Sequence, residues 1–392
     1  MAGPKVKEKW ASWWPESATN LRPWQLVDAY NKGLAGAYHE PEEKEAFEDD
    51  IRQQGGFVFG EDAATASGWA ESGAGQLILP FVWVILHFGK CWPASGQDRG
   101  DCVSHDQRNA NLLSYACEIQ DGKPDQESGK PEQVPKMPSR GMADGAFSTE
   151  VYYWFRRHGR DGWSCDAAAR VAMREGGLVT RDDHTETLGV DLTRYSGRNA
   201  GKYGRTPPSG SVADALDNNL VRTATTLKSK EERRDFLANG YGLSTCGSQG
   251  YSNKRDQWGV SRRRGRWAHA MAFIGFDDRP STVEQYGDTL ELVLNSWAIW
   301  NSGSRQIRDS AGYVKGLIPV ITKTFGLTDA QARQKLIDLD LLDPQTGNLL
   351  IPHGSFWARS RDVSGRRVIA KSSVNGWPKR DLFIPLGSEG NV

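Results

Sequence analysis

The sequence predicts an α+β protein built from two lobes, and three observations support this prediction. The chain has 392 residues, which exceeds what one hydrophobic core usually organises. Helical patterns dominate the first half of the chain, and strand-like apolar runs follow at 271–276 and 290–297. Helices and strands that are segregated along a chain, rather than alternating, are typical of the α+β class.

Composition excludes several classes of protein. Lys and Arg number 49, as do Asp and Glu, so the formal net charge is zero and a polybasic nucleic-acid coat is excluded. Fifteen Trp residues and 10% aromatic residues exclude a disordered chain. The most apolar run, 77–88, is shorter than the roughly 20 residues that span a bilayer. We therefore expect a buried strand or short core segment there, and no membrane contact.

The helical half is expected to centre on residues 102–120. Val103, Ala110 and Cys117 recur at intervals of seven residues, on one stripe of a helix, and Asp101 stands at the N-cap position. Further helices are expected at 148–158, 164–175, 211–220 and 228–238.

The half that follows is expected to be rich in strands. Beside the two runs named above, AGYVKGLIPVI at 311–321 is predicted as a third strand, and a helix then begins where Thr328 and Gln331 form a capping box. These changes in character predict four segments. They are an N-terminal arm or extension at 1–90, a helical lobe at 91–205, a β-rich lobe at 206–320 and a C-terminal extension at 321–392.

Among five cysteines, Cys102 has the context of a nucleophile. It lies in GQDRGDCVSH at the start of a predicted helix, where the partial positive charge of a helix N-terminus lowers a thiol pKa. A buried, unreactive cysteine is the alternative, and on Cys102 alone it is favoured. The odd cysteine count leaves at least one thiol free, and no pair has the C-x-x-C spacing of a zinc site.

Two later segments favour the nucleophile. His269 begins the apolar strand HAMAFIGFDD, and Asn295 ends the strand LELVLN. His269 could act as the base for Cys102, and the amide oxygen of Asn295 could orient the imidazole. Trp297 is large enough to cover that contact. The Gln97 side chain and the backbone N–H of Cys102 are candidate oxyanion donors.

Over about 91–320 the chain resembles the papain-like cysteine peptidases, in particular divergent bacterial or viral members. The resemblance lies in a Q-x-x-G-x-C-V run, the His strand, NSW and a later Gly-Tyr pair, in the order Cys, His, Asn. The matching residues are Gln97, Gly100, Cys102, Val103, His269, Ala270, Gly275, Asp277, Asn295, Ser296, Trp297, Gly312 and Tyr313. This resemblance implies a helical lobe carrying Cys102, a β-barrel-like lobe carrying His269 and Asn295, and a substrate cleft between them. It also implies hydrolysis of peptides through a thioester, without cofactor or metal.

Three functions stay open at this point. The first is a cysteine peptidase acting on polypeptides. The second is a structural or binding component of a larger assembly, such as a virus or phage particle, that reuses the fold with little or no catalysis. The third is another acyl-transfer enzyme, for which Asp would be more usual than Asn295. The Trp-rich N-terminal arm and the C-terminal extension are the segments expected to contact protein partners.

Other signals are weaker. Basic residues crowd the stretch 254–266 before His269, but overall neutrality favours a solvated loop over a nucleic-acid site. His105 and Asp106, one turn after Cys102, could form a second acid–base pair, but the safer prediction places His105 on the helix surface. The first 25 residues lack an apolar signal-peptide core. The family's disulfide pattern is also absent, so a cytoplasmic or particle-associated location is expected.

Overall fold

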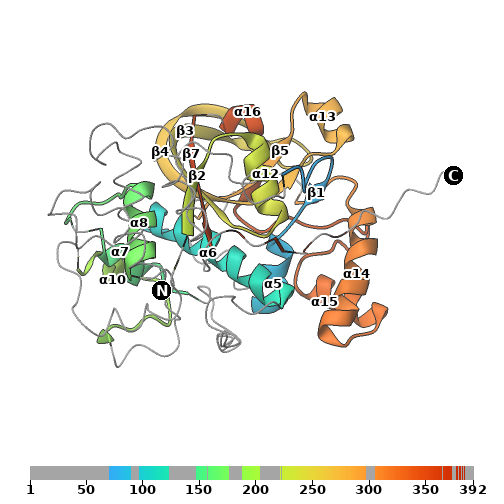
Figure 1. The fold of residues 1–392 in the computed structure, drawn as a ribbon, viewed down its shortest axis with the longest axis horizontal. Coiled ribbons are helices and arrows are strands. Elements are labelled where there is room, and N and C mark those ends of the chain that lie inside the picture. The colour runs from blue at the N-terminus through green and yellow to red at the C-terminus, as the bar shows by residue number, and fades with distance from the viewer. Residues whose placement is uncertain are drawn as a thin grey trace, which may run out of the picture.

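The computed structural model describes residues 70–89, 97–122, 147–156, 158–175, 188–203, 221, 223–296, 305–363 and 365–372, with 377, 379, 380, 382 and 384. Within them, helices and a large β-sheet occur together, which confirms the α+β class. Figure 1 shows the sheet above the long helix α6 (Cys102–Asp121). Three short helices gather at one end of α6, namely α7 (Glu150–Trp154), α8 (Cys165–Glu175) and α10 (Gly197–Gly201).

The sheet has seven strands in the order β2-β7-β3-β4-β5-β6, with β1 paired to β4. The strands are β1 (Leu77–Ile78), β2 (Thr223–Leu227), β3 (Leu243–Arg255), β4 (Val260–Asp277), β5 (Leu290–Leu294), β6 (Ser355–Arg359) and β7 (Arg367–Ser372). Strand β6 pairs antiparallel with β5 and parallel with the first residues of β4. Strands β4, β5 and β6 therefore each pair with the other two, because β4 is long enough to contact β6 at its start and β5 at its end. This curved part of the sheet lies in the region where a barrel-like lobe was expected.

Both expected extensions contribute strands to this sheet. Strand β1 comes from the segment before residue 90, and β6 and β7 come from beyond residue 320. Strand β7 lies between β2 and β3, so it is internal to the sheet. The largest cluster of buried apolar side chains draws on the same segments, with Trp83 near one end of the chain and Leu336 near the other. The four-segment division of the chain stays a prediction, and the Trp-rich arm before residue 70 lies outside the described residues.

The apolar run at 77–88 forms a short strand followed by a helix. Strand β1 ends at Ile78, and Pro80 occupies the N-cap position of helix α5 (Phe81–Phe88), where its missing N–H costs no hydrogen bond. Six of the eight residues of α5 are buried. A helix that is apolar on all sides belongs in a protein interior, so the prediction of a core segment is confirmed.

The predicted strand at 311–321 is wrong, because this segment lies within helix α14 (Ala311–Phe325). Its buried residues recur at the spacing of one helix face, and this helical period outweighs the strand preference of the valines and isoleucines. The buried residues of α14 are Tyr313, Val314, Leu317, Ile318 and Ile321. The predicted helices at 164–175 and 228–238 are confirmed as α8 and α12 (Lys230–Ala238). The predicted capping box of Thr328 and Gln331 begins α15 (Asp329–Asp338).

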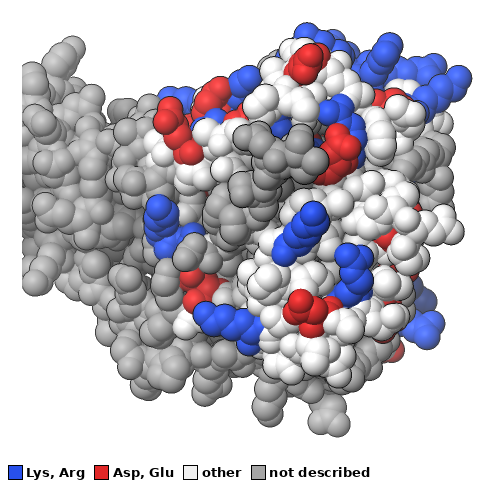
Figure 2. All heavy atoms as spheres, turned by 90° about the vertical axis from the view of Figure 1, so that its right-hand side faces the viewer, with Lys and Arg blue, Asp and Glu red and all other residues white. Residues whose placement is uncertain are grey.

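Two smaller helices complete the described elements. They are α13 (Pro280–Tyr286) and α16 (Ser360–Val363). The helix predicted at 148–158 is the shorter α7, whereas the one predicted at 211–220 lies outside the described residues. No helix in the described part of the chain combines the length and apolar character needed to cross a membrane. On the face shown in Figure 2, acidic and basic side chains are interspersed rather than separated.

Helix α6 packs directly against the sheet, which positions its first residue. A Cβ atom placed on Gly242, just before β3, would lie 1.9 Å from the carbonyl oxygen of Ala110, so glycine permits a backbone-to-backbone approach here. One turn nearer the helix N-terminus, Gln107 Nε2 donates a hydrogen bond to Ser244 Oγ at 3.0 Å. These contacts fix α6 relative to β3, the strand that pairs with β4.

Candidate active site

Cys102 is the first residue of α6 and is half-buried. The N-cap residue Asp101 is fully buried, but its side chain forms no capping hydrogen bond to the helix. Its carboxylate instead accepts a hydrogen bond from Tyr195 Oη at 2.9 Å and lies 3.6 Å from His105 Nε2. The first N–H groups of a helix have no intrahelical acceptor. The backbone N–H of Cys102, at the first position of α6, therefore remains a candidate donor to an oxyanion.

The sulfur of Cys102 lies beside strand β4. The backbone N–H groups of Ala270 and Val103 lie close enough to it to lower the pKa of the thiol. Cys102 also packs against the apolar cluster that contains both of these residues. Because Ala270 directly follows His269 in β4, the helix start meets the strand at the predicted base.

His269 and Asn295 form a direct hydrogen bond. The distance from His269 Nε2 to Asn295 Oδ1 is 2.8 Å, and both residues are buried. They meet because β4 and β5 are antiparallel neighbours in which Ala272 pairs with Leu294, one residue before Asn295. An amide oxygen accepts only, so Nε2 carries the proton and Nδ1 of a neutral imidazole is the basic nitrogen.

Gln97 lies close to the end of β5. Its backbone N–H donates to the carbonyl oxygen of Ser296 at 3.0 Å, and its side-chain amide donates to a carbonyl of its own turn. Asn109 Nδ2 of α6 donates to Ser296 Oγ at 3.1 Å. These bonds connect the turn before Cys102, helix α6 and the residue after Asn295. Trp297 lies outside the described residues, so its covering role stays a prediction.

Burial opposes charge on both Cys102 and His269. The pKa of Cys102 is raised to about 11. Burial is the main cause, the carboxylates of Asp106 and Asp101 also raise it, and the backbone N–H groups of Ala270 and Val103 lower it. Burial also lowers the pKa of His269 to about 4, although the bond to Asn295 opposes this change. The lowered cysteine pKa predicted from the helix N-terminus is not found in this state, because enclosure and two carboxylates outweigh the helix. The pair is therefore a thiol and a neutral imidazole at pH 7.

The prediction that His105 lies on the helix surface is wrong, because both His105 and its neighbour Asp106 are only 1% exposed. Burial raises the pKa of Asp106, and the charge of Lys371 on β7 is the largest opposing effect. The Lys371 ammonium donates to the side chains of Gln107 and Asn111. These buried polar groups extend behind Cys102 along α6, a feature that the helical stripe in the sequence did not reveal.

Cys165 and Cys246 form a disulfide that joins α8 to β3. In the sheet, Cys246 pairs with Ala270, so this bridge lies one position from His269. The sequence lacks the family's disulfide pattern, and no motif in it indicates this pairing, because the two cysteines are 81 positions apart. Within the described residues, Cys102 and Cys117 are free thiols.

One group of potential metal ligands occurs in the described part of the chain. Side-chain ligand atoms of Asp106, Cys165 and Cys246 lie within 4.8 Å of one another. The two sulfurs are joined in the disulfide, whereas thiolates are the form that binds metal. Asp106 Oδ2 lies 3.8 Å from Cys165 Sγ. Asp106 is therefore a neighbour of the disulfide, and this group is not proposed as a metal site.

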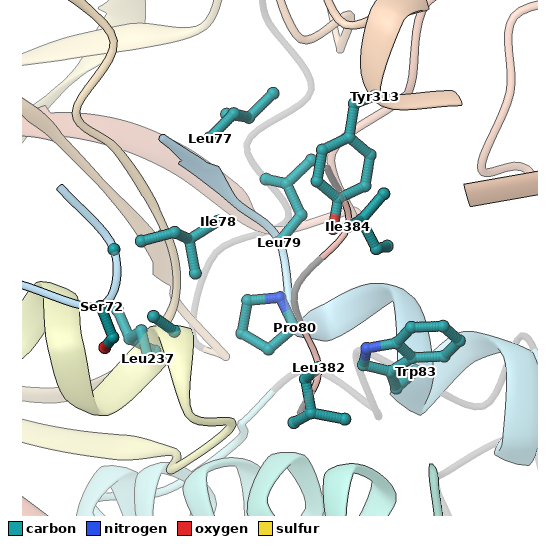
Figure 3. Close-up of a pocket in the computed structure, with 12 residues that line it drawn as sticks. Ser72, Leu77, Ile78, Leu79, Pro80, Trp83, Leu237, Tyr313, Leu382 and Ile384 are labelled. Carbon is teal, nitrogen blue, oxygen red and sulfur yellow. The ribbon is translucent and has the colours of Figure 1, made fainter. Parts of the chain in front are cut away.

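A separate small cavity of about 20 Å³, lined mostly by apolar residues, lies beside the start of α5. Figure 3 shows Pro80, Trp83 and Tyr313 around it, together with Leu382 from near the C-terminus. None of Cys102, His269 or Asn295 lines this cavity. It is therefore not part of the candidate active site.

Comparisons with known proteins give structural but no sequence matches. No family model matches the chain, and no curated protein sequence matches it. Xylellain, a cysteine protease from Xylella fastidiosa, is similar with a TM-score of 0.39 and 13% identity over 72% of this chain and 82% of its own. ProCathepsin B S9 from Trypanosoma congolense has a TM-score of 0.38 and 11% identity over 75% and 76% of the two chains.

A third similar structure is digestive procathepsin L 3 of Tenebrio molitor larval midgut. Its TM-score is 0.32, with 9% identity over 89% of this chain and 98% of its own. Likeness at these scores and identities does not decide the activity of this chain. The functional argument therefore rests on the geometry of the site.

Proposed function

We propose that this protein is a papain-like cysteine peptidase that hydrolyses peptide bonds, with Cys102 as nucleophile, His269 as base and acid, and Asn295 as the orienting residue. One observation carries the proposal. The His269–Asn295 hydrogen bond of 2.8 Å stands next to Ala270, a member of the apolar cluster against which Cys102 packs. A nucleophile, a base and an orienting amide side chain in this relation form the arrangement used in covalent acyl transfer.

The proposed reaction proceeds through a thioester. The Cys102 proton passes to Nδ1 of His269 while the sulfur attacks the peptide carbonyl carbon, and the oxygen becomes an oxyanion. The C–N bond then breaks as the imidazolium protonates the leaving amine. In the second half, His269 takes a proton from water, the hydroxide attacks the thioester, and the thiol is regenerated as the acid leaves.

The neutral state of the pair affects the first step. Because the Cys102 pKa is raised to about 11 and the His269 pKa is lowered to about 4, charge separation is unfavourable in the enclosed site. Proton transfer would therefore accompany attack on the substrate rather than precede it. The backbone N–H of Cys102 and the side chain of Gln97 are the proposed donors to the oxyanion.

A second candidate function is a structural or binding component of a larger assembly with little or no catalysis. The observation that favours it is the raised Cys102 pKa, since a thiol that stays protonated is a poor nucleophile. In this case the Trp-rich N-terminal arm and the C-terminal extension would be the sites of protein contact. The protein would then hydrolyse no peptide, and alkylation of Cys102 would require high pH.

The test is hydrolysis of a fluorogenic peptide library by the wild-type protein and by Cys102→Ala, His269→Ala and Asn295→Ala. We expect no turnover with Cys102→Ala and a fall of roughly 10²- to 10⁴-fold with His269→Ala, the range typical of general acid–base catalysis. Thermal unfolding of each variant controls for folding. If the wild-type protein cleaves no peptide, or if Cys102→Ala cleaves as fast as the wild type, the peptidase proposal is wrong.

A further inference from the structure

A buried arginine from the C-terminal part of the chain lies against the candidate active site. Arg366 precedes β7 and is 7% exposed. Its Nη2 donates to the carbonyl oxygen of His269 at 2.7 Å, its Nη1 donates to the carbonyl oxygen of Gln249 at 2.9 Å, and its Nε donates to Thr245 Oγ1 at 3.1 Å. All three donor nitrogens are thereby held, so the guanidinium has a fixed position.

A glycine makes room for this side chain. Gly247 on β3 is the residue that pairs with His269 across the sheet. A Cβ atom at Gly247 would lie 2.9 Å from Cγ and 3.3 Å from Cζ of Arg366. The guanidinium therefore crosses β3 at the position opposite the candidate base.

The charge of Arg366 is not neutralised by an ion pair. Across the ranges that the structure describes, its nitrogens form no salt bridge with a carboxylate. Its neighbours at longer range are Tyr251, Asp106 and Cys102, each of which would attract a cation when ionised. An arginine remains charged even where burial lowers its pKa. A buried cation held by neutral acceptors exerts a strong field on nearby groups.

We propose that Arg366 is a positioning residue that fixes the backbone of His269 and stabilises negative charge on the Cys102 sulfur during catalysis. This inference rests on the proposed function, because it assigns the countercharge for the same nucleophile. Arg366 also disfavours a proton on His269, which makes the imidazolium a stronger acid toward the leaving amine.

Other charged groups face the same sulfur and act with or against Arg366. The carboxylates of Asp101, the N-cap of α6, and of Asp106 within α6 oppose a thiolate. From β4, His269 would favour a thiolate only when protonated. From β7, Lys371 acts on Asp106 and so weakens the effect of that carboxylate. Among these described groups, Arg366 is thus the one that supports a thiolate while the imidazole is neutral.

The test is the alkylation rate of Cys102 against pH, followed at that residue by mass spectrometry, in the wild type, Arg366→Gln and Arg366→Lys. We expect Arg366→Gln to raise the pH at which Cys102 reacts by about one unit, equivalent to a roughly tenfold slower reaction at fixed pH. Arg366→Lys keeps the charge and should react at a rate near that of the wild type. Arg255→Gln is the matched control, because its guanidinium lies eight positions farther along β3 from Gly247 and donates to the Ser355 carbonyl.

A second measurement separates charge from structure. Iodoacetate is anionic and iodoacetamide is neutral, so the ratio of their rates reports the local potential and is independent of the thiolate fraction. The ratio should fall in Arg366→Gln and stay near the wild-type value in Arg366→Lys and Arg255→Gln. An unchanged ratio and pH profile in a folded Arg366→Gln protein would overturn the inference. Neither measurement needs a peptide substrate, so failure of the peptidase proposal would be seen separately, as absence of turnover.

Discussion

The helices α5 and α6 are both buried, yet their sequences differ in kind. Helix α5 has apolar residues at all its buried positions, from Phe81 to Leu86. Helix α6 buries a run of polar and charged side chains, which are Ser104, His105, Asp106, Gln107, Arg108 and Asn109. An apolar side chain gains free energy on burial, whereas a polar one costs free energy unless it finds hydrogen-bond partners. The polar helix therefore depends on its surroundings in a way that the apolar helix does not.

The partners of α6 are the elements that form the site. Gln107 bonds to Ser244 on β3, and Asn109 bonds to Ser296 after β5. Arg108 Nη1 donates to the Phe147 carbonyl oxygen at 3.4 Å. Each bond ties α6 to a segment distant in sequence, so the polar side chains define where the helix start lies. The comparison indicates that α5 stabilises the fold and that α6 positions Cys102.

The largest effect on stability is expected from Trp83→Ala in α5. Trp83 is 2% exposed in the main apolar cluster, so truncation should cost roughly 3–5 kcal/mol in the free energy of unfolding. Urea unfolding measures this loss, and the exposed Val283→Ala is the control, expected within about 0.5 kcal/mol. The folded variant should keep the pH profile of Cys102 alkylation. A shifted profile would mean that α5 also controls the site.

A similar loss is expected when the bridge between α8 and β3 is removed. Cys165 and Cys246 are 81 positions apart. Closing a loop of this size lowers the conformational entropy of the unfolded chain, which stabilises the folded state by about 4 kcal/mol. Replacing both cysteines by serine should lower the free energy of unfolding by that amount. Reduction of the wild-type protein should cause a comparable loss, whereas the double variant should not respond to reductant. Equal sensitivity of both proteins to reductant would contradict this assignment.

The acid stability of the protein should report the state of His269. Its pKa is lowered from 6.5 to about 4 in the folded protein, so the unfolded chain binds its proton first as the pH falls. Stability from this group is therefore complete above pH 6.5 and lost between pH 6.5 and about 4, by about 3 kcal/mol. The His269→Gln variant should lose this part of the pH dependence in urea unfolding. The opposite result would be that the wild-type protein becomes more stable than His269→Gln as the pH falls. That result would indicate a protonated imidazole paired with a thiolate.

The sequence was sufficient for the parts of the site that depend on local pattern. The apolar stripe after Cys102 predicted α6, and the strands next to His269 and Asn295 follow from runs of apolar residues. His269 and Asn295 are joined by a hydrogen bond, and the catalytic roles predicted for them stay a proposal. Periodicity within a short window decides each of these features.

The other features depend on contacts between distant segments. Arg366 is 97 positions from His269, and no motif around it signals a contact with the site. The disulfide and the buried environment of Asp106 also arise only when β3, β7 and α6 pack together. Burial is a property of the assembled core, which is why a helix-start cysteine was predicted with a lowered pKa and has a raised one. The strand predicted at 311–321 failed for another reason, since β-branched residues there follow a helical period.

The smallest effect on stability is expected from Asn109→Ala in α6. Loss of its hydrogen bond to Ser296 should cost about 1 kcal/mol, much less than Trp83→Ala. Because Ser296 follows Asn295, we expect this variant to slow Cys102 alkylation and peptide turnover more than Trp83→Ala does. Gln120→Ala is the matched control, since Gln120 Nε2 donates to Thr324 Oγ1 at the far end of α6. If Asn109→Ala and Gln120→Ala leave the alkylation rate equally unchanged, the polar face of α6 is structural, and the distinction between the two helices would be one of composition alone.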